Sequence, residues 1–182
     1  MNHTCVITVG LVGSGLILLV IVGAWLAVLV PMALLYTLWL KPAGLMDAAV
    51  VEVHRRLSGV NLTSGGRYLA LAIFYSLAHS LLEEYYWRWF TFAELRRLVP
   101  LAAAIAISSL GFMAHHVIVL AAYFGWGSPL TLVLSLSVAV GGAMWAWIYD
   151  RRQSLYAPWL SHLLVDAGIF VIGYDMLHGM PN

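Results

Sequence analysis

Three groups of ionisable side chains stand inside long apolar stretches of this sequence, and their types could support hydrolytic chemistry. The groups are Glu83, Glu84 and Arg88; His115 and His116; and His162 and Asp166. A charged group is energetically costly in an apolar environment. An ionisable residue in such a stretch is therefore a candidate functional residue. Carboxylates and imidazoles, with no Ser or Cys obviously paired to a base, favour activation of a water molecule over a covalent intermediate.

Helical spacing predicts different partners for the two adjacent glutamates, Glu83 and Glu84. Glu84 and Arg88 are four residues apart, so they share a helix face and can form an ion pair. Glu83 points about 100° away and is left without that partner, which suits a general base. An ion pair at a helix end, or a hydrogen bond between helices, would explain any one group without catalysis.

The composition indicates what must surround these residues. The chain has 182 residues, of which 63% are hydrophobic and 9% are charged. A soluble domain carries roughly 25% charged residues, so this chain requires lipid as its solvent. The formal net charge of +1 gives no reason to expect nucleic acid as a partner. The single cysteine, Cys5, excludes an internal disulfide and a cysteine-based zinc site.

The apolar stretches predict an all-α, polytopic transmembrane helix bundle with about five spans plus one interfacial amphipathic helix. A bilayer needs about 20 apolar residues as helix, which predicts spans over 6–40, 68–92, 101–124, 130–149 and 154–177. Apolar and charged residues at helical spacing predict the amphipathic helix over 44–58, followed by a loop over 61–66. Gly141 and Gly142 are expected to let the fourth span pack closely against a neighbour.

These spans place the ionisable groups at similar depths. Glu83 and His162 each lie roughly 12 Å from the same membrane face, and His116 roughly 20 Å, at about 1.5 Å per residue. We therefore expect them to converge in one intramembrane cavity. Basic residues are balanced between the two membrane faces, with Lys41, Arg55, Arg56 and Arg67 on one side and Arg96, Arg97, Arg151 and Arg152 on the other. We expect the second set to be cytoplasmic, because its arginines lie close to span ends.

In order and spacing, the three groups resemble the motifs of the CAAX protease and bacteriocin-processing (Abi) family of intramembrane glutamate endopeptidases, related to the type II CAAX prenyl endopeptidases. Residues 83–88, with Glu83, Glu84 and Arg88, are similar to its EExxxR motif. Residues 112–116 are similar to FxxxH, and residues 162–166 to HxxxN or HxxxD. The resemblance covers about residues 68–175, so we predict an Abi-type catalytic core over 68–182. Residues 1–67 are expected to form the N-terminal transmembrane helix and interfacial amphipathic segment.

The resemblance implies a CAAX-type membrane endopeptidase, a hydrolase that cleaves a membrane-associated protein or peptide. Glu83 and His116 would activate the water, and His162 and Asp166 would lie at the oxyanion. Prenyl endopeptidases carry Asn where this chain has Asp166. An ionised carboxylate cannot donate to an oxyanion, so Asp166 is expected either to be protonated or to orient His162.

The remaining residues of the motifs are expected to support the site: Glu84, Arg88 and His115. No cofactor is required by this mechanism. Zinc held by Glu83, His116 and His162 is an alternative, because these are suitable ligand types, although their spacing does not match an HExxH helix.

Other functions fit the same residues. A non-catalytic membrane protein of the same fold could act in bacteriocin immunity or as a scaffold. A proton- or ion-coupled transporter could use the buried acids and histidines, but the sequence shows no internal repeat. In each case we expect a multi-pass integral protein of the bacterial inner (cytoplasmic) membrane.

Overall fold

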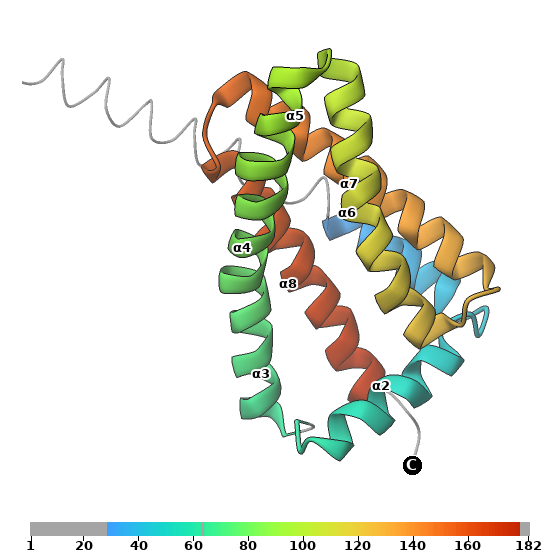
Figure 1. Ribbon diagram of the computed structural model, residues 1–182. Coiled ribbons are helices and arrows are strands. Elements are labelled where there is room, and N and C mark those ends of the chain that lie inside the picture. The colour runs from blue at the N-terminus through green and yellow to red at the C-terminus, as the bar shows by residue number, and fades with distance from the viewer. Residues whose placement is uncertain (1–28, 63, 179–182) are drawn as a thin grey trace, which may run out of the picture.

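The computed structural model describes residues 29–62 and 64–178, and every regular element within these ranges is helical (Figure 1). Three helices are long and apolar enough to cross a membrane: α6 (Leu101–Phe124), α7 (Pro129–Arg152) and α8 (Tyr156–His178). They coincide within a few residues with the third, fourth and fifth predicted spans. The predicted all-α membrane helix bundle is therefore confirmed.

The second predicted span is part of a longer helix that alternates between α and π geometry. Its segments are α3 (Gly65–Phe74), η2 (Tyr75–His79), α4 (Ser80–Glu84), η3 (Tyr85–Phe92) and α5 (Ala93–Leu98). The helix starts earlier and ends later than the predicted 68–92, so the expected loop ends before Gly65. π-Helical turns are frequent at functional sites, and here they flank the short α4 that carries both glutamates.

The structure bears on the first predicted span only over Leu29–Leu40, which is an apolar helix ending in η1 (Tyr36–Leu40). The rest of that span, 6–28, lies outside the described residues. The helix is joined to α8 by Asp175, whose Oδ2 accepts from the hydroxyl of Tyr36 at 2.7 Å and pairs with Lys41 Nζ at 2.6 Å.

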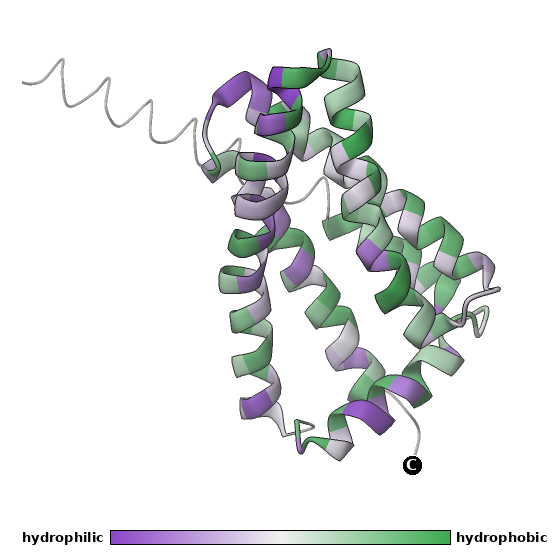
Figure 2. Ribbon diagram, viewed as in Figure 1, coloured by the Kyte–Doolittle hydropathy of each residue, from purple (hydrophilic) through white to green (hydrophobic). Residues whose placement is uncertain are grey.

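The amphipathic helix is α2 (Asp47–Gly59), slightly displaced from the predicted 44–58 because residues 41–46 form a turn. Its Ala49 is buried in a core cluster with Tyr36, Leu40, Met46 and Met176. Its other face carries Glu52 with Arg55 and Arg56, whose hydrogen bonds lower the pKa of the Glu52 carboxyl to about 2. A face that stays ionised suits the position at the end of the bundle that Figure 2 shows.

The most extensive helix contact joins α6 and α7, which form an antiparallel hairpin (Figure 1). Gly125, with φ of +85°, ends α6, and the Ser128 hydroxyl accepts from the N–H of Leu130 to cap α7. Residues 125–128 form the turn that joins these two helices. Of the two adjacent glycines in α7, Gly142 faces α6: a Cβ there would lie 3.1 Å from the Phe112 ring and 3.4 Å from the Ser109 backbone.

Gly142→Val is expected to push α7 away from α6 and lower the free energy of unfolding by about 1–3 kcal/mol, the usual cost of overpacking. Gly141→Val is the matched control, because a Cβ at Gly141 meets only the Trp145 side chain at an ordinary 3.7 Å. The measurement is thermal unfolding of both purified variants in detergent. Equal melting temperatures would contradict the assigned packing of Gly142.

Candidate active site

The structure brings the three predicted groups together at mid-height in the bundle, from α4, α6 and α8. Glu83 is their meeting point. Its Oε1 lies 2.9 Å from Nε2 of His115, and its Oε2 lies 3.5 Å from Nε2 of His162. Nearly all of its side chain is covered, with 12% exposed. The predicted convergence of the three groups is therefore what the structure shows.

Glu84 makes a separate, fully buried set of contacts. Its Oε1 lies 2.9 Å from Nη1 of Arg88, as the four-residue spacing predicted, and also accepts from Nδ1 of His162 at 2.7 Å. The side chains of Glu84 and Arg88 are 0% and 2% exposed. Because Nδ1 of His162 donates to Glu84, its Nε2 is turned toward Glu83.

Two aromatic rings contact the Arg88 guanidinium. It lies 4.4 Å from the ring centre of Phe112 and 5.0 Å from that of Trp145, and its Nη2 donates to the Gly142 carbonyl at 3.4 Å. Cation–π contacts of this kind gain strength when they are desolvated. The ring of His162 stacks on Trp145, with centres 4.2 Å apart. Trp145 therefore contacts two site residues, Arg88 and His162. The sequence did not predict this role, because nothing in the spacing of α7 distinguishes one tryptophan.

The two adjacent histidines of α6 differ in what they contact. His116 Nδ1 donates to the Phe112 carbonyl at 3.0 Å, so in the neutral ring its Nε2 is an unprotonated acceptor. His115 instead donates from Nε2 to Glu83 and stacks on Trp87, with centres 5.7 Å apart. Among the described residues, Nε2 of the motif residue His116 forms no hydrogen bond, and one ring nitrogen of His116 lies within 4.8 Å of a Glu83 oxygen. The neighbour His115 makes the direct hydrogen bond.

Asp166 does not take the orienting position that one of our alternatives gave it. Its Oδ1 lies 3.6 Å from Nε2 of His162, the nitrogen that faces Glu83. The opposite nitrogen, Nδ1, is the one that a partner uses to fix a histidine ring, and Glu84 occupies it. Orientation of His162 therefore comes from Glu84, a residue predicted only to support the site.

A metal ion would find suitable donors here, although the set differs from the predicted one. Ligand atoms of Glu83, His115 and His116 lie within 4.8 Å of one another. His162, a predicted ligand, is outside this group, although its Nε2 lies 3.5 Å from Glu83 and contact of its Nδ1 with Glu84 is compatible with metal binding. Ligands of a tetrahedral zinc ion lie about 3.4 Å apart, since each bond is about 2.1 Å. The three donors therefore fit zinc in type, and in spacing after small inward shifts.

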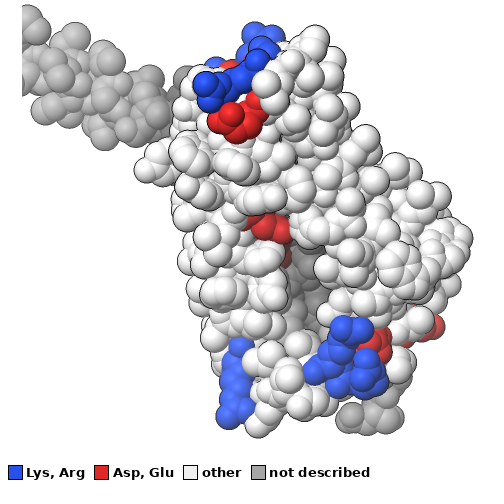
Figure 3. All heavy atoms as spheres, viewed as in Figure 1, with Lys and Arg blue, Asp and Glu red and all other residues white. Residues whose placement is uncertain are grey.

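A hollow leads to this region from the surface. Figure 3 shows it between the helix over 65–98 and α6, with acidic atoms in its upper part and basic atoms on both sides of its lower end. The helix over 65–98 contacts α6 through η3 and α5, and it contacts α8 through α3, η2 and α4. The helices therefore diverge below η3, which leaves a route from the surface toward Glu83.

Apolar spanning helices around a buried, charged and partly accessible centre define an integral membrane protein with a polar site between its spans. The sequence profile of the family described as Type II CAAX prenyl endopeptidase Rce1-like matches residues 65–168. This match covers more than half of the chain, so the protein belongs to that family. The family membership predicted from the three motifs is therefore confirmed. The domain boundary between residues 67 and 68 stays a prediction. No curated protein and no solved structure matches the chain significantly.

Arg88→Met is expected to lower the free energy of unfolding by about 3–5 kcal/mol, because it leaves the Glu84 charge buried without its cation. Arg97→Met is the matched control: Arg97 also pairs with a glutamate of the same helix, Glu94, but the two side chains are 75% and 55% exposed. Exposed pairs contribute less than about 1 kcal/mol. Thermal unfolding in detergent measures both. Similar losses in the two variants would argue against a special contribution of the buried pair.

Proposed function

We propose that this protein is an intramembrane endopeptidase that hydrolyses a peptide bond of a membrane-associated protein or peptide. The observation that carries the proposal is the position of Glu83, whose carboxylate faces imidazoles from two other helices while Glu84 takes up the buried cation. A carboxylate that neutralised Arg88 would be a poor base. Glu83 is spared that contact, and its oxygens face the histidines instead.

In this mechanism a water molecule sits between Glu83 and the free Nε2 of His116. The water oxygen bonds to the scissile carbonyl carbon as its proton passes to Glu83. The carbonyl oxygen becomes an oxyanion, and a protonated Nε2 of His162 or a protonated Asp166 donates to it. The C–N bond then breaks, and the proton on Glu83 moves to the leaving amine nitrogen. The balance of charge and atoms is complete without a cofactor.

The family suggests substrates that are proteins anchored at the membrane, and the hollow beside α6 offers access for an extended chain. An extended segment suits the reaction because a peptide bond in a helix is shielded by its own hydrogen bonds. We place the enzyme in a bacterial inner membrane, as the sequence favours.

Glu83→Gln is expected to reduce peptide cleavage by about 10²–10⁴-fold, the usual contribution of a general base, without loss of folding. The assay is cleavage of a proteome-derived peptide library by the purified protein in detergent, read by mass spectrometry. Glu94→Gln, which changes an exposed carboxylate on the same helix, is the matched control. Undiminished cleavage by a well-folded Glu83→Gln protein would refute the mechanism. A function that survives this change without any cleavage would support the scaffold or immunity alternative.

The two histidines give a second test of how water is activated. His116→Ala is expected to abolish cleavage, since it removes the free nitrogen beside Glu83. His115→Ala removes a hydrogen bond that only positions the carboxylate, so we expect it to retain more activity, with a loss of about tenfold. A chelator should not affect the wild type. If both variants are inactive and the chelator also abolishes cleavage, the centre is instead a metal site of Glu83, His115 and His116.

A further inference from the structure

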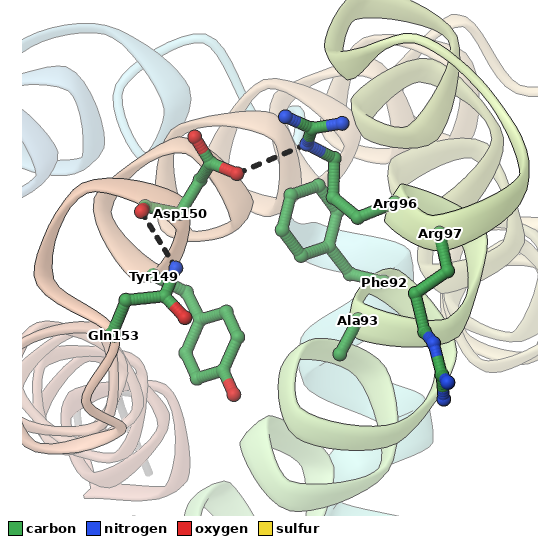
Figure 4. Close-up of a pocket in the computed structure, with 7 residues that line it drawn as sticks. All are labelled: Phe92, Ala93, Arg96, Arg97, Tyr149, Asp150 and Gln153. Carbon is green, nitrogen blue, oxygen red and sulfur yellow. Dashed lines mark hydrogen bonds and ion pairs between the residues drawn. The ribbon is translucent and has the colours of Figure 1, made fainter.

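A second polar site lies away from Glu83, where α5 and α7 end together. Figure 4 shows a pocket there, between the last turns of the two helices. Its volume is about 280 Å³. Pockets for drug-sized ligands start at about 300 Å³, so this one suits a compact group rather than a whole substrate. The reaction described above uses none of its residues.

The charges around the pocket favour an anion. Four arginines gather at this end of the bundle against two carboxylates, Glu94 and Asp150. Two of the arginines, Arg96 and Arg97, line the pocket itself. The ends of apolar helices mark the boundary between hydrocarbon and water, so these guanidinium groups lie at the depth of lipid headgroups.

One edge of the Arg96 guanidinium is held in place, and its other edge faces no hydrogen-bond partner among the described residues. Its Nε donates to Oδ1 of Asp150 at 3.0 Å, and the Asp150 carbonyl in turn accepts from the side chain of Gln153 at 2.7 Å (Figure 4). The two terminal nitrogens of Arg96 form no hydrogen bond with any residue that the structure describes. Two such nitrogens match two oxygens of a phosphate.

Arg97 is available for the same ligand. It pairs with Glu94 at 3.2 Å, but its side chain is three-quarters exposed, and such pairs are weak enough to exchange for a phosphate. Apolar side chains continue from the pocket along the helix that carries it. Trp89 and Phe90 are half exposed one turn before Ala93, and Leu98 is largely exposed beyond it. A ligand with a phosphate and hydrocarbon chains would contact both surfaces.

We propose that this pocket, lined by Phe92, Ala93, Arg96, Arg97, Tyr149 and Asp150, binds the headgroup of an anionic phospholipid. Arg96 and Arg97 hold the phosphate, and the acyl chains lie along Trp89 and Phe90. Basic pockets between transmembrane helices are known to bind anionic headgroups. The site is independent of the peptidase proposal, since lipid binding can be measured without cleavage.

The test is native mass spectrometry of the full chain in detergent, with phosphatidylglycerol or phosphatidylcholine added. We expect the wild type to retain phosphatidylglycerol in preference. Arg97→Gln should weaken that binding about fivefold, and Arg96→Gln with Arg97→Gln about 25-fold, from the usual contribution of one basic residue near an anionic lipid. Ala93→Phe should abolish binding by filling the pocket without changing the charge.

Arg151→Gln is the matched control. Arg151 lies at the same end of the bundle but outside the pocket, against the ring of Trp147. Equal losses in Arg151→Gln and Arg97→Gln would overturn the site in favour of a diffuse surface charge. Competition by glycerol 1-phosphate as strong as that by the lipid would replace the lipid with a soluble phosphate. Equal retention of the two phospholipids would overturn the proposal altogether.

Discussion

The buried ion pair of Glu84 and Arg88 is the interaction on which the rest of this structure depends. Two charges removed from water are stable only when each has close partners. Here one carboxylate oxygen receives both Arg88 and the Nδ1–H of His162, and the guanidinium lies against two aromatic rings. The pair itself is on the helix over 65–98, and its partners are on α6, α7 and α8. The pair therefore joins four helices at one point.

This constraint explains several features of the surrounding fold. Arg88 reaches α7 through the Gly142 carbonyl, and α7 approaches α6 at the same glycine. Trp145, one turn from Gly142, carries Arg88 on its ring and stacks on His162. The π-helical η3 places Arg88 and Trp87 in the turn that faces α6 and α7. Close packing in this region therefore stabilises the buried charges as well as the apolar core.

The same arrangement separates two neighbouring carboxylates into different environments. Glu84 is buried and paired with a cation, whereas Glu83 faces histidines at the inner end of the hollow. Adjacent residues on a helix point in directions about 100° apart, so one helical turn can hold two carboxylates in different surroundings at the same depth. His162 connects them, with one nitrogen on each. Through that connection, the buried pair influences the orientation of the imidazole that faces Glu83.

Most of the fold could be predicted from the sequence. Hydrophobic length alone predicts α6, α7 and α8, and the Gly-rich turn at 125–129 follows from local backbone chemistry. The four-residue spacing of Glu84 and Arg88 predicts their pairing, because residues at that spacing are neighbours on any helix. Periodicity did not predict the π-helical segments or the full extent of the helix over 65–98, since these depend on how neighbouring helices pack.

The sequence by itself determined which residues gather at the site, through three motifs on three apolar segments, and with them the family. Only the tertiary structure decided how those residues are paired. Glu84 orients His162, His115 rather than His116 bonds Glu83, and Trp145 supports the centre from a helix without a motif. The physical reason is that residue spacing fixes directions within one helix, whereas contacts between helices depend on their relative rotation and separation. Those are set by packing across the whole bundle.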